Sequence, residues 1–189
     1  PLPATEVEGR IDWTRRFDHM QQHTGQHLLS AVAERLLGAA TTSVHFGTAS
    51  SSVELAREAL DPAEVRDLEE AANGIVTENR PVTVSAEDAE HAEGLRRPSA
   101  RPGSLRIVTI EGLDRSACGG THVRTTGEIG PILLRKVERI RKQVRVEFLC
   151  GARAIRRARL EYDILSGIAG GASAAVEDLP AVVEKWKAD

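Results

Sequence analysis

The stretch HMQQHTGQHLLSAVAERLLG, from His19 to Gly38, joins three evenly spaced histidines to an apolar helical pattern. Its apolar residues recur at intervals of three and four, which is typical of one buried face of a helix; they are Leu28, Leu29, Val32, Leu36 and Leu37. Gly38 stands where a left-handed C-terminal cap is expected. The stretch predicts a long helix from about Asp18 to Leu37.

Hairpins and further helices are predicted on the C-terminal side of this helix. A segment rich in Ser, Thr and Val, residues 41–55, predicts two short strands joined at Gly47. Asp61, Pro62 and Glu64 form a strong helix start, so we expect a second helix to about Asn79. Strands are expected at 82–84, 105–110, 129–140 and 144–149. Between the first two of these strands, a short helix is expected at 85–94 and a loop at 96–103. The C-terminal helices are expected at about 151–168 and 176–186. Because helices alternate with antiparallel hairpins, the predicted fold class is α+β, an antiparallel sheet with packed helices.

The charge of the chain is unevenly distributed. The formal net charge is −3 over 189 residues, but residues 135–159 hold ten bases and two acids. The bases are Arg135, Lys136, Arg139, Arg141, Lys142, Arg145, Arg153, Arg156, Arg157 and Arg159. Such a segment fits a phosphate-rich partner, and it equally fits a solvated surface.

The two cysteines are too few for a disulfide framework, and no apolar run has the length of a membrane span. We therefore expect a cytoplasmic protein without a membrane partner. The chain begins at Pro1 without a signal-peptide pattern, so it is expected to be processed or to be part of something longer.

Two pairs of residues four apart predict a metal site. His23 and His27 stand one turn apart on the same helix face, so both rings can reach one ion. About ninety residues later, in GLDRSACGGTHVRTTGEIG, Cys118 and His122 are separated by two glycines in a loop that follows a strand. Three imidazoles and one thiolate form a donor set that suits tetrahedral Zn²⁺. A buried structural cysteine with a core histidine is the alternative interpretation.

His19 shares the face of His23 and could in principle replace one ligand. Two considerations place it outside the site. Asp18 is expected to cap the helix, which puts His19 in the first turn, and a tetrahedral site needs only two ligands from this helix.

These motifs resemble the editing domain shared by alanyl-tRNA synthetases, threonyl-tRNA synthetases and the free-standing alanyl-tRNA editing proteins of the AlaX group. The resemblance is carried by HTGQHLL and CGGTHV, and it extends to IDWTRRFDHMQQHTGQHLLSAV and TGEIGPILLRKVERIRKQVRVEFLCGARA, which look most like the long AlaX-type proteins. It covers about Ile11 to Ala154. Position by position, the metal motifs of the family fall on His23, His27, Cys118 and His122.

The resemblance implies a fold and a division of the chain. Residues 1–15 are expected to be an arm or the remnant of a missing β-barrel domain. Residues 16–152 are expected to form the zinc-dependent editing domain, of the type called the second additional domain of threonyl- and alanyl-tRNA synthetases. Residues 153–189 are expected to form a C-terminal helical extension.

The resemblance also implies an activity, namely zinc-dependent, ATP-independent hydrolysis of mischarged Ser-tRNA(Ala) in trans, with Gly-tRNA(Ala) as a further candidate. Aminoacylation is not expected, because the synthetase activation domain is absent from the chain. The backbone amides of Gly119 and Gly120 are candidate oxyanion donors, and Thr24, Gln26, Thr42 and Ser43 are candidate substrate-binding residues.

The acceptor end of tRNA(Ala) is the expected partner. The bases from Arg135 to Arg157 are candidate contacts to its phosphates, and with 3% aromatic residues the chain has little capacity for base stacking. Other classes of function stay open: a tRNA-binding or assembly module with a structural zinc, or a metallohydrolase for another aminoacyl ester or amide. The sequence leaves the oligomeric state open.

Overall fold

The computed structural model describes residues 8–188. Its central element is the helix α1 (Trp13–Leu37), which ends at Gly38 in the left-handed conformation, as predicted. The helix begins five residues earlier than predicted, because Asp12 and not Asp18 is the N-cap: the Asp12 side chain accepts a hydrogen bond from the amide of Arg15 at 3.0 Å. Residues 1–7 of the predicted arm lie outside the described residues, and residues 13–15 belong to the first turn of α1.

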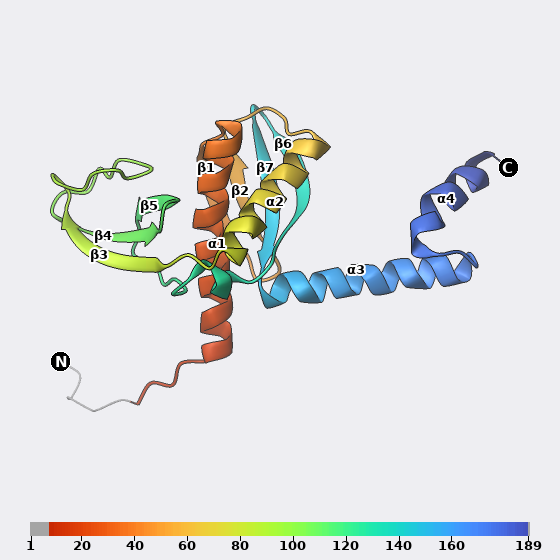
Figure 1. Cartoon of the computed structure of the whole chain (residues 1–189), viewed down its shortest axis with the longest axis horizontal. Helices are drawn as coiled ribbons and strands as arrows, with labels where there is room; N and C mark the ends of the chain where they lie inside the picture. The colour runs from red at the N-terminus through yellow and green to blue at the C-terminus, as the bar shows by residue number, and fades with distance from the viewer. Residues whose placement is uncertain (1–7, 189) are drawn as a thin grey trace, which may run out of the picture.

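A four-stranded antiparallel sheet packs against α1. Its strands are β1 (Thr41–Phe46), β2 (Ser51–Leu55), β6 (Ile132–Ile140) and β7 (Gln143–Cys150), in the order β1-β2-β7-β6. The predicted hairpin between the last two strands is confirmed, with Arg141 at a φ of 58° in its turn. The helix α2 (Pro62–Thr77) lies beside α1 on the same face of the sheet (Figure 1), and its predicted capping box is present. Side chains from both helices and the sheet, such as Leu28, Leu68 and Phe148, form the core.

A smaller antiparallel sheet lies on the other side of α1 (Figure 1). It contains β3 (Val82–Asp88), β4 (Ser104–Ile110) and β5 (Asp114–Ala117), in that order. The short helix predicted for 85–94 is wrong, because residues 85–88 continue β3 and pair with β4, Ser85 opposite Ile107 and Asp88 opposite Ser104. Strand pairing therefore overrides the local helical preference of this segment. The 3-10 helix η1 (Thr126–Ile129) connects this region back to β6.

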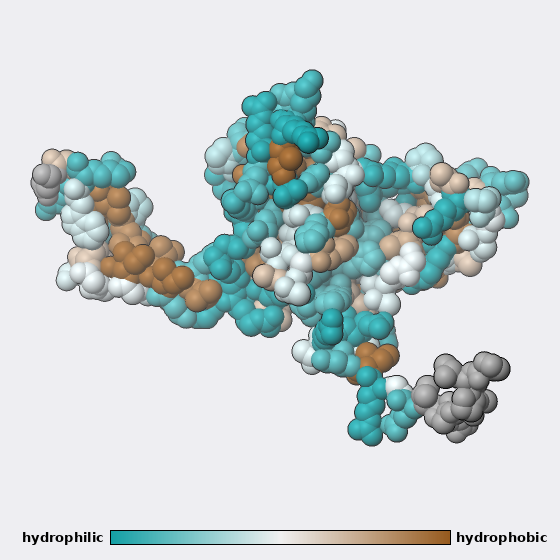
Figure 2. Space-filling view, turned by 180° about the vertical axis from the view of Figure 1, so that it is seen from behind, coloured by the Kyte–Doolittle hydropathy of each residue, from teal (hydrophilic) through white to brown (hydrophobic). Residues whose placement is uncertain are grey.

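The C-terminal helices extend away from the two sheets (Figure 1). They are α3 (Ala152–Gly171) and α4 (Leu179–Ala188), joined through the 3-10 helix η2 (Val176–Asp178). Arg153, in the first turn of α3, is only 8% exposed and pairs with Asp18 of α1 at 2.7 Å, so it fastens the start of this arm to the body. Farther along, apolar side chains such as Leu160, Ile164 and Ile168 are exposed, and Figure 2 shows an apolar patch along the arm.

The fold class is therefore α+β with antiparallel sheets, as predicted, and residues 8–188 contain four α-helices. Within this part of the chain, no helix has the length and apolarity needed to span a bilayer.

Candidate metal centre

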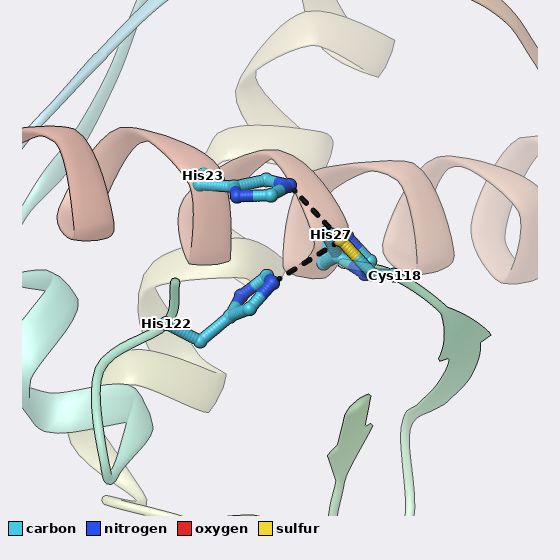
Figure 3. Close-up of side chains that lie close together, drawn as sticks. All are labelled: His23, His27, Cys118 and His122. Atoms are coloured by element: carbon cyan, nitrogen blue, oxygen red, sulfur yellow. Dashed lines mark hydrogen bonds between the residues drawn. The ribbon is translucent and has the colours of Figure 1, made fainter. Parts of the chain in front are cut away.

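The four predicted metal ligands converge on one point between α1 and the loop after β5 (Figure 3). Their ligand atoms all lie within 4.8 Å of one another. The Cys118 Sγ is 3.4 Å from Nε2 of His23 and 3.4 Å from Nε2 of His122. A tetrahedral zinc with its usual bond lengths places nitrogen and sulfur donors roughly 3.5 Å apart, so the spacing of these donors fits the ion.

The loop that carries Cys118 and His122 is held by Arg106 of β4. The guanidinium Nη1 of Arg106 donates to the carbonyls of Cys118 and Gly120, both at 2.7 Å. Gly120 lies so close to α1 that a Cβ added to it would be 2.2 Å from Cε1 of His23, whereas one added to Gly119 would meet nothing within 4 Å. Of the two glycines, Gly120 is therefore the one that the convergence of the site requires.

His27 is oriented by a buried carboxylate. Its Nδ1 lies 2.9 Å from Oδ2 of Asp114, whose side chain is completely buried and also accepts from Nε of Arg96 at 2.7 Å. Burial acts to lower the pKa of His27, but the hydrogen bonds to Asp114 and Cys118 outweigh it, and the pKa is raised above 6.5. Burial acts to raise the pKa of Asp114, but the hydrogen bond to His27 and the charge of Arg96 lower it. With Nδ1 engaged by a carboxylate, Nε2 of His27 is directed at the cluster.

His122 is oriented by Thr24, which is fully buried. The Thr24 hydroxyl lies 3.1 Å from Nδ1 of His122 and accepts a hydrogen bond from the amide of Val123 at 3.1 Å. When Nδ1 of His122 donates to this hydroxyl, Nε2 carries a lone pair that faces Cys118. Thr24 thus supports a predicted metal ligand, a role that differs from the substrate contact expected of it.

The surroundings of Cys118 favour its thiolate form. Burial acts to raise the pKa of Cys118, but its hydrogen-bonding contacts with His122, His23 and His27 and with the backbone of Gly120 lower it to about 3. The role of the Gly120 amide as an oxyanion donor stays a prediction. Desolvation lowers the pKa of His122, which favours the neutral imidazole. A thiolate with neutral imidazoles is the protonation state that binds metal.

His19 is exposed and lies outside the group of ligand atoms, as predicted. The expected reason was wrong in one respect. Asp18 does not cap the helix, so His19 is in the second turn of α1 and not in its first. His19 instead lines a cavity of about 600 Å³ beside the cluster, together with His23, Phe46, Ser51 and Gly120.

The other predicted substrate residues lie away from this cavity. Gln26 is buried and donates to the hydroxyl of Ser30 at 2.8 Å. Thr42 is on β1 and donates to Oε1 of Gln143 at 2.8 Å. Ser43 lines a different hollow with Glu54 and Arg145.

Most of the bases in this segment are paired with acids, four of them with an acid from another part of the fold. Seven of the ten bases lie within 4 Å of a carboxylate: Arg135, Lys136, Arg139, Arg145, Arg153, Arg157 and Arg159. The other three bases of the segment, Arg141, Lys142 and Arg156, have no such partner within residues 8–188. Arg153 is buried and its guanidinium is paired with Asp18, so its contact with phosphate stays a prediction that requires this pair to open.

Asp114 and the cavity residues Phe46 and Ser51 were not predicted as functional. A signal for Asp114 exists in the sequence, because Asp114, Ser116 and Cys118 alternate along a strand and so share one face. No comparable pattern marks Phe46 or Ser51.

Residues 105–146 match the family described as threonyl and alanyl tRNA synthetase second additional domain. The chain is similar to an alanyl-tRNA editing protein Aarsd1 from Bos taurus, 35% identical over 97% of this chain and 43% of the relative. It is also similar to the alanyl-tRNA editing protein Aarsd1-B from Xenopus laevis, which is 39% identical over 85% of this chain and 40% of the relative. A third relative is an alanine–tRNA ligase from Pyrococcus abyssi, which is 38% identical over 96% of this chain and 21% of the relative.

The chain spans less than half the length of these curated relatives. Residues 105–146 are thus similar to part of the threonyl and alanyl tRNA synthetase second additional domain, and over most of its length the chain is similar to alanyl-tRNA editing proteins and alanine–tRNA ligases.

Proposed function

We propose that the chain is an aminoacyl-tRNA deacylase that hydrolyses mischarged Ser-tRNA(Ala) in trans, without aminoacylation. The observation that carries the proposal is a cluster of three histidines and one cysteine that opens on a cavity, in a chain similar to proteins named for alanyl-tRNA editing. Residues 16–152 are the proposed catalytic unit. Gly-tRNA(Ala) is a second substrate to test.

Zinc is the proposed metal, held by His23, His27, Cys118 and His122. Three imidazoles and a thiolate match the donors that zinc prefers. Asp114 orients the ring of His27, and Thr24 orients the ring of His122. Bound zinc supplies Lewis acidity to the ester carbonyl or to the attacking water. Four protein donors are also typical of structural zinc, so the proposal depends on the cavity that adjoins the cluster.

The residues around the cluster are suited to positioning an activated ester. His23 belongs both to the cluster and to the wall of the cavity, so a substrate in the cavity approaches the cluster from the His23 side. Arg106 fixes the loop through two carbonyls, which keeps this wall in place. Because an ester of this kind is already inclined to hydrolyse, orientation of the substrate contributes much of the catalysis.

The acceptor end of tRNA(Ala) is the proposed partner. Arg141, Lys142 and Arg156 are the proposed phosphate contacts, because they have no carboxylate partner within residues 8–188 and are exposed. The paired bases contribute less, since each phosphate contact must first displace a protein carboxylate.

The proposal is tested by deacylation assays on Ser-tRNA(Ala), Gly-tRNA(Ala) and correctly charged Ala-tRNA(Ala), with zinc content measured in parallel. Hydrolysis of Ser-tRNA(Ala) in preference to Ala-tRNA(Ala) is expected. A protein that binds one zinc per chain and hydrolyses none of the three contradicts the proposal and favours the tRNA-binding module with a structural zinc.

Two histidine variants test the ligand assignment. His27→Ala is expected to lose zinc and activity, because it removes a ligand and leaves Asp114 without its imidazole partner. His19→Ala, on the same helix, is expected to retain zinc. Loss of zinc from His19→Ala contradicts the assignment.

A further inference from the structure

The buried carboxylate of Asp114 is contacted by an arginine from the long loop between β3 and β4. This loop, residues 89–103, contains no helix or strand. Its Arg96 donates from Nε to Oδ1 of Asp114 at 2.7 Å, while Oδ2 of the same carboxylate lies 2.9 Å from Nδ1 of His27. A continuous chain of contacts therefore leads from the loop to one of the proposed zinc ligands.

Arg96 is held in place by its own backbone and by the packing around it. Its side chain is only 13% exposed, and its amide donates to the carbonyl of Arg115 at 2.8 Å. On the side away from Asp114, Nη1 of Arg96 lies 3.8 Å from Oε2 of Glu34 on α1, and neither of these two buried atoms has a hydrogen-bond partner within residues 8–188. The contact with Asp114 is therefore the one close ion pair that Arg96 makes in this part of the chain.

The negative charge of Asp114 needs a cation beside it. The Asp114 side chain is completely buried, and a buried carboxylate without a counter-charge is strongly unfavourable. Its salt-bridge partners within the described part of the chain are His27 and Arg96. Because a histidine that binds a metal does so as the neutral imidazole, Arg96 is the partner that keeps its charge when the site is loaded.

Arg96 also determines how the carboxylate is turned. Its guanidinium contacts Oδ1, which leaves Oδ2 of Asp114 directed at His27. The hydroxyl of Ser116 lies 3.0 Å from both oxygens, so it does not distinguish between them. Carboxylates that orient ligating histidines are themselves hydrogen-bonded as a rule, and the loss of such outer contacts weakens metal binding.

We propose that Arg96 is a positioning residue for the metal ligand His27 and that it acts through Asp114. The zinc affinity of the site then depends on how loop 89–103 packs against α1 and β5. None of the residues of this loop lines the cavity beside the cluster, so the effect reaches the metal from the side opposite to the proposed substrate. The inference rests on the proposed function, because it concerns the zinc that this function requires.

The test is a double-mutant cycle on zinc affinity, measured by competition with a chromophoric chelator. Arg96→Met removes the guanidinium and keeps an unbranched side chain. It is expected to weaken zinc binding by about tenfold in the wild-type background. In the Asp114→Asn background the same change is expected to weaken zinc binding by less than about twofold, because the carboxylate through which Arg96 acts is already gone. Equal losses in the two backgrounds, or no loss in the wild-type background, overturn the inference.

The cycle distinguishes a positioning residue from one that only stabilises the loop. A residue of the second kind lowers zinc affinity by the same factor in both backgrounds. Urea unfolding of the metal-free proteins shows whether each variant is folded. If Arg96→Met does not fold, the cycle is run with Arg96→Lys, which keeps the charge but lacks the planar fork of the guanidinium. This variant is expected to lose about threefold in zinc affinity in the wild-type background and none with Asp114→Asn, and equal losses again overturn the inference.

Arg97→Met is the matched control, because Arg97 is the next residue of the same loop, is exposed and takes part in no salt bridge within residues 8–188. It is expected to keep the zinc affinity of the wild type. A loss as large as that of Arg96→Met would show that any change in the loop suffices, and it would overturn the inference.

Deacylation of Ser-tRNA(Ala) by the zinc-bound wild type is assayed separately. The proposed function fails if that hydrolysis is absent, whatever the cycle shows. The inference fails if Arg96 and Asp114 act independently on zinc affinity, even where the wild type is an active deacylase. A wild type that binds no zinc overturns both.

Discussion

Replacement of Gly120 by alanine should disable the metal site while leaving the fold intact. A Cβ at this position lies 2.2 Å from Cε1 and 2.5 Å from Nδ1 of the His23 ring. Ordinary contact begins at 3.4 Å, so the ring must retreat by about 1.2 Å. Metal–nitrogen distances tolerate only about 0.2 Å, which makes this shift roughly six times too large for coordination. We expect zinc affinity to fall by about 100-fold or more, beyond the effect of losing a supporting hydrogen bond.

The assay for Gly120→Ala is a zinc competition titration against a chromophoric chelator, accompanied by urea unfolding of the metal-free protein. The free energy of unfolding should change by less than about 1 kcal/mol, because the imidazole can rotate aside at little cost. Gly119→Ala is the matched control, since its added methyl group meets nothing within 4 Å. Equal zinc affinities for the two variants would show that the approach of the loop to His23 does not govern the site.

The remaining predictions concern the groups behind the ligands and the base of the arm. Zinc affinity should fall as the pH is lowered through the pKa of His27, which lies above 6.5, because a proton then competes with the ion. Cys118, with a pKa of about 3, takes up no proton near neutral pH. The chelator titration repeated between about pH 5 and 8 measures this dependence, and a flat profile contradicts it. Asp114→Asn should weaken zinc binding by about tenfold to 100-fold. It should also move the pH dependence of zinc affinity to lower pH, because it removes the carboxylate that raises the pKa of His27. An unaltered pH dependence would count against the role of the carboxylate. Arg153→Ala should lower the free energy of unfolding by about 2–3 kcal/mol, because it leaves the half-buried carboxylate of Asp18 unpaired. Replacement of the exposed Arg156 by alanine should change the free energy of unfolding by less than about 0.5 kcal/mol. Urea unfolding compares the two variants, and similar losses contradict the prediction.

The helix and the ligand set could be predicted from the sequence because both depend on local spacing. Four-residue steps on a helix place His23 and His27 on one face, and a glycine pair allows Cys118 and His122 to converge. The start of α1 was predicted wrongly for a related reason. Both Asp12 and Asp18 are good capping residues; in the structure Asp12 caps the helix, and Asp18 pairs with the distant Arg153 instead.

Contacts between distant segments explain what the sequence did not reveal. The basic segment appeared strongly charged because its partners Glu54, Glu58 and Glu161 come from other elements or lie just beyond the segment. Residues 85–88 were predicted as helix because their pairing with β4 leaves no local signal. The cavity was not predictable, since Phe46 and Ser51 acquire their significance only from the position of α1.

The cluster also has a mechanical consequence. It brings together α1, which packs against the larger sheet, and the loop that follows β5 of the smaller sheet, and within residues 8–188 these two sheets share no strand ladder. An ion bound there closes a loop of about 95 residues between His23 and Cys118. A permanent cross-link over a loop of that size stabilises a fold by about 4.7 kcal/mol in the chain-entropy model. With the proposed metal bound, its supply would set how firmly α1 and the loop after β5 are coupled, in addition to the proposed activity of the site.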